Sequence, residues 1–144
     1  QEWEASLAPF IKQSPIWRLH VYRDALFAFD LAKFDSRRLK RSLETRALIP
    51  QLYRAVGSIG ANLVEGSSRS SGTDRKRFFE YALGSAREAD HWYHGCDVVL
   101  GEVITAHRRQ HLQGICAQLV TLIPKQFNLR EETQEYSDYN LGNE

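Results

Sequence analysis

Residues 79–100 read FEYALGSAREADHWYHGCDVVL and carry an apolar residue at every third or fourth position. The repeat consists of Phe79, Ala82, Ala86, Ala89, Tyr93, Cys96 and Leu100. Alternating steps of three and four put these side chains on one face of an α-helix, which is the seam along which the helices of a bundle pack. Three alanines in this seam predict that a neighbouring helix approaches closely. We expect a helix over residues 73–100, with Thr73 as its N-cap.

Three further segments have the same period and predict three more helices. Their apolar positions are Leu19, Tyr22, Leu26, Phe29 and Ala32 in residues 17–34, Ile49, Leu52, Val56, Ile59 and Leu63 in residues 45–65, and Ile104, Leu112, Ile115, Leu119 and Leu122 in residues 103–123. Pro50 suits a first helical turn, and Gly66 suits a C-terminal cap. Gly101 suits a break before the last helix, and Pro124 is expected to end that helix. Residues 35–44 either extend the first helix or connect it to the second.

These four helices predict an all-α chain folded as an antiparallel, up-down-up-down four-helix bundle. The 144 residues suit one domain that can bury a core without disulfides or metals. The expected parts are an N-terminal arm, loose or briefly helical, over residues 1–15, the four-helix bundle over residues 16–126, and an acidic mobile tail over residues 127–144. Because the chain contains no Met, we expect its natural start to lie upstream of Gln1.

Charge is spread unevenly along the chain, although the net charge is only +1. Residues 17–77 hold 13 basic and 6 acidic residues, whereas residues 128–144 hold one basic and five acidic residues. A basic first half indicates a nucleic-acid or acidic-protein partner, or else a solvated surface rich in arginine. The candidate nucleic-acid contacts are Arg37, Arg38, Lys40, Arg41, Arg69, Arg75, Lys76 and Arg77.

The first four of these residues end helix one, and the other four lie between helices two and three. Successive links of an up-down bundle lie at opposite ends, so we expect the two groups to stay apart in one subunit. Backbone contact with little sequence readout is expected, because aromatic stacking motifs of the RNA-binding sheet type are absent. The acidic tail, with Glu131, Glu132 and Glu135, could compete for the same surfaces.

No catalytic, metal or cofactor motif emerges from the sequence. His107 and His111 have ligand-like i, i+4 spacing, but the run lacks the glutamate of a hydrolytic zinc helix. No nucleophile elbow or phosphate-binding glycine loop is present. Cys96 and Cys116 lie in apolar surroundings and are interpreted as small core residues in a reducing compartment, with a disulfide between neighbouring helices as the alternative.

A membrane or export role is not expected from the sequence. No apolar run approaches the roughly 20 residues that a membrane-spanning helix needs. The first twelve residues also lack the basic start and apolar stretch of a signal peptide. The chain is therefore expected in the cytoplasm.

Asn62 and Glu65 are polar residues on a mainly apolar helix. A buried Asn without partners costs roughly 1–3 kcal/mol, so Asn62 should be hydrogen-bonded. Glu65 could face either Arg69 or Arg87 across the loop. We interpret Asn62, Glu65 and Arg87 as a structural polar lock between helices two and three, with a ligand or catalytic role as the alternative.

The same region carries a family resemblance. SIGANLVEG at residues 58–66, followed by ALGSARE at residues 82–88, resembles the 23S rRNA-intervening-sequence protein family. VYRDA at residues 21–25, LA at 31–32 and QLYRAV at 51–56 also resemble the family, so that the likeness spans residues 17–124.

The resemblance implies a four-helix bundle that assembles into a ring-like homopentamer, without enzymatic activity or cofactor. Its members are encoded within insertions in bacterial large-subunit rRNA genes or elsewhere in bacterial genomes, and a role in binding RNA or other nucleic acid is expected. The accessory variability proteins of diversity-generating retroelements are similar in fold and pentameric form, and they bind a reverse transcriptase and nucleic acid through a basic surface.

Excess apolar surface also predicts an oligomer, because several large side chains fall off the inner seams. These side chains are Trp17, Phe27, Phe34, Phe78, Trp92 and Val98. An exposed patch above a few hundred Å² usually marks an interface. The sequence therefore favours an oligomeric nucleic-acid-binding bundle, with a protein-only scaffold as the alternative and a helical enzyme or metal protein as the third hypothesis.

Overall fold

The computed structural model describes residues 2–126, and every regular element within that range is helical. The elements are α1 (Glu2–Ser6), α2 (Pro9–Gln13), the 3-10 helix η1 (Pro15–Arg18), α3 (His20–Leu39), α4 (Leu43–Arg46), α5 (Ile49–Ser67), α6 (Gly72–His94), α7 (Asp97–Leu100) and α8 (Glu102–Lys125). The all-α class predicted from the helical period is confirmed.

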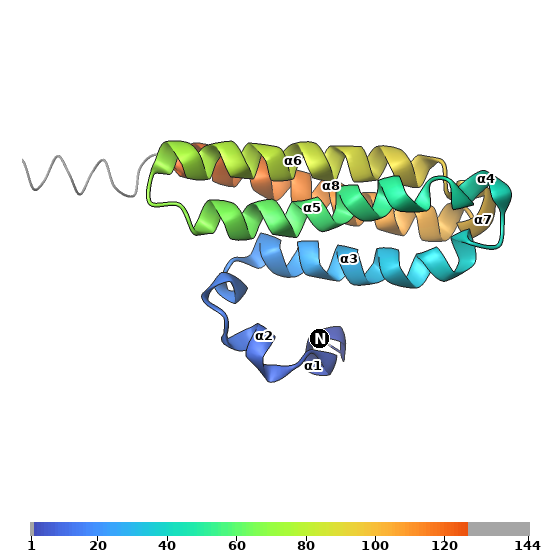
Figure 1. Ribbon diagram of the computed structural model, residues 1–144, viewed down its shortest axis with the longest axis horizontal. Helices are drawn as coiled ribbons and strands as arrows, with labels where there is room; N and C mark the ends of the chain where they lie inside the picture. Colours follow the sequence, from blue (N-terminus) through green and yellow to red (C-terminus); the bar gives the residue numbers. More distant parts are fainter. Residues whose placement is uncertain (1, 127–144) are drawn as a thin grey trace, which may run out of the picture.

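The four long helices, α3, α5, α6 and α8, lie side by side and form the four-helix core (Figure 1). Helix α6 packs against α5 and α8, and α3 contacts the same two helices. The segment between α3 and α5, which contains α4, lies at one end of the core together with α7; we call this the α4 end (Figure 1). The short connection between α5 and α6 lies at the opposite end, which we call the turn end.

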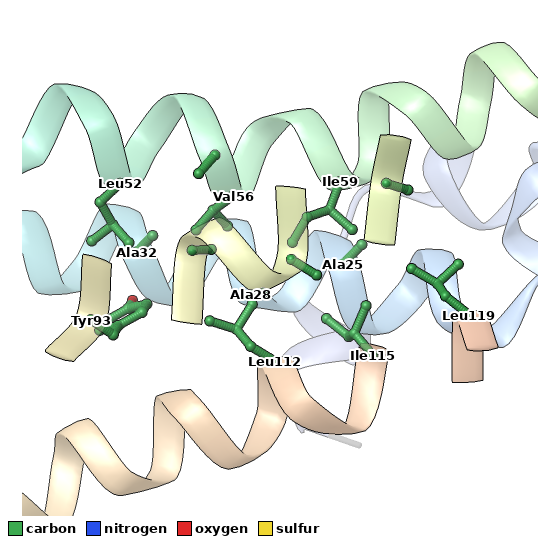
Figure 2. Packing of buried hydrophobic residues seen from close by; sticks show 14 of the residues in the cluster. Ala25, Ala28, Ala32, Leu52, Val56, Ile59, Tyr93, Leu112, Ile115 and Leu119 are labelled. Carbon is green, nitrogen blue, oxygen red and sulfur yellow. The ribbon is translucent and has the colours of Figure 1, made fainter. Parts of the chain in front are cut away.

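The apolar seam predicted over residues 79–100, which runs from α6 into α7, is the centre of the core, as its spacing predicted. All seven seam residues are buried, and Ala82, Ala86 and Ala89 are wholly inaccessible. Figure 2 shows side chains of α3, α5 and α8 converging on the same interior. The labelled residues there are Ala25, Ala28, Ala32, Leu52, Val56, Ile59, Tyr93, Leu112, Ile115 and Leu119. Small residues on facing helices permit close packing, and larger side chains fill the space between them.

The buried face of α3 differs from the predicted one. Leu19, Tyr22, Leu26 and Phe29 are only half-buried, whereas the fully buried stripe runs one position away along the helix. That stripe contains Val21, Ala25, Ala28, Ala32 and Leu39. Alanine carries no bulk beyond its methyl group, so α3 approaches its neighbours along the small residues. The larger aromatic side chains are displaced to the flanks, where they cover the edge of the core.

Several predicted helix boundaries need correction. Helix α3 continues to Leu39, so residues 35–39 extend it and residues 40–42 connect it to α4. Helix α6 begins at Gly72, because Ser71 has an extended backbone and its hydroxyl accepts a hydrogen bond from the Asp74 N–H. Thr73 therefore lies inside the first turn. Helix α6 also stops at His94, and α7 follows as a separate helical turn. Gly101 (φ +83°) then interrupts the helical backbone before α8, as predicted.

Neither Gly66 nor Pro124 ends its helix as expected. Helix α5 runs to Ser67, and Gly66 is buried against α6. A methyl group on Gly66 would lie 2.9 Å from Cδ1 of Phe79, so this glycine serves close helix packing. Pro124 lies in the last turn of α8, which reaches Lys125. A proline there removes one hydrogen bond from a turn that already frays, which explains its tolerance.

The N-terminal arm folds against the outer side of α3 (Figure 1). The Trp3 indole donates a 2.8 Å hydrogen bond to Asp30, and its ring packs 5.0 Å from Phe27 and 6.4 Å from Trp17, centre to centre. Trp17 and Phe27 are therefore half-buried in a single chain, as are Phe78 and Trp92, contrary to the expected exposure. Phe34 and Val98 are exposed as predicted. The predicted acidic tail lies outside the described residues.

Candidate nucleic-acid interface

The α4 end displays the first predicted group of basic residues. Residues 37–46 contain five basic residues and one acidic residue, Glu44. Arg37, Lys40 and Arg41 are exposed, and within residues 2–126 none of their side chains forms a hydrogen bond or ion pair. Arg38 makes only a 3.4 Å contact with the carbonyl of Val99. Together with Arg46, these residues form what we call the α4-end patch.

The backbone beneath this patch is fixed by side-chain hydrogen bonds. The Thr45 hydroxyl is buried and donates to the carbonyl of Leu39 at 2.6 Å, which satisfies an acceptor at the end of α3. The Arg46 guanidinium donates to the Lys40 carbonyl at 3.2 and 3.0 Å. Ser42 caps α4 by accepting from the Glu44 N–H at 3.2 Å. The charges are therefore carried by a defined turn.

A buried ion pair lies beneath the patch. Asp35 is 1% exposed and accepts hydrogen bonds from the Tyr93 hydroxyl at 2.9 Å and from Arg108 at 2.8 and 3.0 Å. Burial, with the charge of Asp35 beside it, raises the pKa of Tyr93 well above its ordinary range, so the phenol stays a donor. Hydrogen bonding to Asp35 raises the pKa of Arg108. This cluster joins α3, α6 and α8 with each carboxylate oxygen satisfied.

The sequence interpretation missed this ion pair, although a signal was available. Asp35 follows Ala32 by three positions and precedes Leu39 by four, so it continues the buried stripe of α3. A single carboxylate at a seam position requires a buried cationic partner, since an isolated buried charge is strongly destabilising. The partner itself, Arg108, could not be chosen among the arginines without the register of α8.

The turn end holds the second predicted group, and here most charges are compensated. Residues 65–80 contain four basic and three acidic residues. Arg69 pairs with Glu65, Arg77 with Asp74 at 3.4 Å and Lys76 with Glu80 at 3.9 Å. Arg69 and Arg77 also lie over the Phe78 ring, at 5.0 and 5.5 Å from its centre. Figure 1 shows that the segments carrying the two basic groups lie at opposite ends of the core.

A protein-family model described as 23S rRNA-intervening sequence protein matches residues 18–124. The chain belongs to this family. The match covers nearly all of the four-helix core and both basic groups, and it agrees with the span of the resemblance seen in the sequence motifs. No curated protein matches the chain.

In this family member, the predicted polar lock between α5 and α6 does not form. Asn62 donates to the Ser58 carbonyl of its own helix at 2.8 Å. Glu65 pairs with Arg69, one of its two predicted partners, and Arg87 is exposed. The reason is register: Asn62 lies at the edge of the buried face, within reach of its own preceding turn.

Other polar pairs join the helices instead. Arg54 of α5 pairs with Glu88 of α6, which also accepts from the Trp92 indole at 3.2 Å. These hydrogen bonds, from Trp92 and then from Arg54, lower the pKa of Glu88. Arg109 of α8 pairs with Asp90 of α6 at 2.7 Å. Each pair is partly exposed and contributes little on its own.

The histidines and cysteines have ordinary helical surroundings. His111 contacts the Asp24 carbonyl at 2.9 Å, and His107 contacts Arg108 at 2.8 Å. Among residues 2–126, no three His, Cys, Asp or Glu side chains gather as a metal site would require. Cys96 and Cys116 are free thiols, and burial raises the pKa of both. In the same range, no helix is both long and apolar enough to cross a bilayer.

Proposed function

We propose that this chain is a non-enzymatic, cytoplasmic RNA-binding protein whose four long helices form an antiparallel, up-down-up-down bundle and assemble into a ring-like homopentamer. The observation that carries the proposal is the α4-end patch. It combines a strong excess of positive charge with exposed guanidinium and ammonium groups that form no ion pair among residues 2–126. Such groups neutralise backbone phosphates and release counterions. The family name, which refers to an intervening sequence of 23S rRNA, supports RNA as the nucleic acid.

An exposed aromatic ring adds to this support. Phe34 is 60% exposed and lies three positions before Arg37 and four before Arg38, on one stripe of α3. An aromatic ring beside arginines lets an unpaired base stack while the phosphates meet the cations. Because the candidate contacts are cations and one aromatic ring, we expect affinity to depend on charge and stacking more than on sequence.

Assembly into a ring would strengthen the contact. Apolar side chains remain exposed at the same end, namely Leu43 at 81%, Val98 at 67% and Val103 at 83%. Large apolar side chains exposed at one end favour an interface there, and closed rotational symmetry is the usual outcome. A ring would repeat the α4-end patch around its axis and multiply the phosphates that one RNA contacts, which would make binding steeply dependent on salt.

A binding titration with a structured RNA, at about 50 and 200 mM salt, tests the proposal. Replacing Arg37 and Arg41 by Gln should weaken binding roughly tenfold at low salt and flatten the salt dependence by about two phosphate contacts. The matched control replaces Arg69 and Arg77 by Gln at the turn end, where each arginine already has a carboxylate partner. We expect a much smaller loss there. Absence of RNA binding by the wild-type protein at the lower salt concentration would refute the proposal.

The exposed apolar residues favour a second candidate, a protein-only scaffold or adaptor. In that case Phe34, Leu43 and Val98 would meet a protein partner, such as a reverse transcriptase, and the basic residues would serve solubility or subunit pairing. Light scattering together with the RNA titration separates the two candidates. An oligomer that does not bind RNA supports the scaffold candidate. A monomer of about 17 kDa, the mass of one chain, excludes the ring-like assembly.

A further inference from the structure

A pocket at the turn end lies apart from the α4-end patch. It has a volume of about 540 Å³ and opens between η1, the beginning of α6 and the end of α8. Ile16, Leu19, Phe79 and Leu122 supply apolar lining. This volume lies in the range of small-molecule sites, which are typically concave and mostly apolar, with few polar groups.

Three cations line the pocket: Arg18, Arg75 and Lys125. They come from three different elements, so only the folded chain brings them together. Within residues 2–126, none of the three forms an ion pair. Their state contrasts with that of Arg69, Lys76 and Arg77 nearby, each of which has a carboxylate partner. Positive charge at the turn end is therefore available at this pocket.

Arg75 supplies a second, independent indication. Its Nε is buried, and no group of residues 2–126 accepts a hydrogen bond from it. Buried donors in folded proteins are nearly always paired, because an unpaired donor has lost its hydration without gaining a partner. An acceptor brought by a ligand would complete this arrangement, and a guanidinium binds phosphate oxygens through two parallel hydrogen bonds.

We propose that this pocket binds a nucleoside 5′-phosphate, either as a free nucleotide or as the terminal nucleotide of an RNA strand. The apolar lining suits the flat ring of a base, and Arg18, Arg75 and Lys125 suit the phosphate. A terminal phosphate monoester carries a charge of about −1.5 to −2 at neutral pH. An internal phosphodiester carries a single charge, so three converging cations favour the terminal group. As an RNA-end site, the pocket deepens the proposed RNA-binding function and rests on it.

Titration calorimetry with AMP, adenosine and inorganic phosphate tests the pocket directly on the full chain. AMP should bind at least roughly tenfold more tightly than either fragment, because only AMP fills both the apolar and the cationic parts. Arg75→Gln and, separately, Lys125→Gln should each weaken AMP binding roughly tenfold or more. Arg87→Gln, an exposed arginine of the same helix, is the control and should bind AMP like the wild type. Helical content by circular dichroism checks that each variant folds.

Two RNA oligonucleotides that differ only in a 5′-phosphate or 5′-hydroxyl test the terminal source. Tighter binding of the phosphorylated strand, abolished by Arg75→Gln, supports an RNA-end site. AMP binding without that preference assigns the pocket to free nucleotide. If AMP binds no better than inorganic phosphate, or if Arg75→Gln changes nothing, the pocket proposal is overturned while RNA binding at the α4-end patch can still hold. If AMP binds and no RNA does, the proposed function fails and the pocket stands.

Discussion

The two ends of the four-helix core carry similar numbers of basic residues and use them differently. At the α4 end, five basic residues in ten positions have one acidic neighbour, and three of them are exposed without partners among the described residues. At the turn end, Glu65, Asp74 and Glu80 each lie three or four positions from a cation and compensate it. Local spacing of acidic residues, more than the count of basic ones, therefore decides where positive charge is available.

The ends also differ in how they are held together. The α4 end has the buried Asp35–Tyr93–Arg108 cluster, which links three helices through a carboxylate. At the turn end, Gly66 of α5 packs against the Phe79 ring of α6. This apolar contact requires a close approach of the two helices and involves no charged group. A buried ion pair requires every partner to be present, whereas an apolar contact tolerates any change that preserves volume. These differences in charge and in packing between the two ends lead to four predictions.

The largest effect is expected from Asp35→Ala. Removal of this carboxylate leaves the Arg108 guanidinium and the Tyr93 hydroxyl without their acceptor in a buried site, which should lower the free energy of unfolding by about 3–5 kcal/mol. Urea unfolding followed by circular dichroism measures the change. Asp90→Ala is the control, because its pair with Arg109 is partly exposed and should contribute about 1 kcal/mol or less. Equal losses in both variants would contradict the role given to the buried cluster.

The second prediction concerns the turn end. Gly66→Ala places a methyl group 2.9 Å from Cδ1 of Phe79 and 3.0 Å from Cβ of Phe78, and the overpacking should cost about 1–3 kcal/mol of unfolding free energy. Gly84→Ala in α6 is the matched control, since a methyl group there meets nothing within 4 Å. That variant should be stabilised by up to about 1 kcal/mol through higher helix propensity. Stabilisation of both variants would show that the α5–α6 contact is looser than described.

The third prediction reverses the charge difference between the ends. Glu65→Gln with Asp74→Asn removes the partners of Arg69 and Arg77 while leaving the arginines in place. We expect RNA affinity at low salt to rise about threefold and the salt dependence to steepen, because more cations can meet phosphates. Thermal unfolding should change little, since exposed pairs of this kind contribute about 0.3–0.5 kcal/mol each. Unchanged RNA affinity would mean that the turn end does not contact RNA even when its charges are released.

The smallest effect concerns the reactivity of the thiol at the α4 end. Burial raises the pKa of Cys96 to about 11, with a smaller contribution from Asp35. Since folding favours the protonated thiol, alkylation should be slow at pH 8 and accelerate as the pH rises towards 11. We expect the folded chain to react at Cys96 roughly tenfold or more slowly than the urea-unfolded chain. Mass spectrometry after timed iodoacetamide treatment measures this rate, and equal rates in the two states would contradict the described burial.

Much of the fold followed from helical periodicity. The α6 seam was predicted residue by residue, because a strict alternation of three and four admits one buried face. On the α3 face only Ala32 was predicted correctly, because two stripes of that helix are apolar and only the packing distance selects the one with alanines. The predicted N-cap of α6, Thr73, was also wrong. Ser71 is the N-cap, and the backbone geometry decides between the two residues. The Glu65–Arg69 pair was one of two predicted alternatives, whereas the pairs of Lys76 with Glu80 and of Arg77 with Asp74 were not predicted.

The sequence by itself determined the helical class, the family, the seam of α6 and the position of the basic residues, since all of these depend on spacing along one chain. The tertiary structure alone decided two things: the partner of the buried Asp35, and the meeting of Arg18, Arg75 and Lys125 at one pocket. These features join residues from different helices. Their distances depend on the register and approach of the packed helices, and no periodicity within a single helix encodes that register.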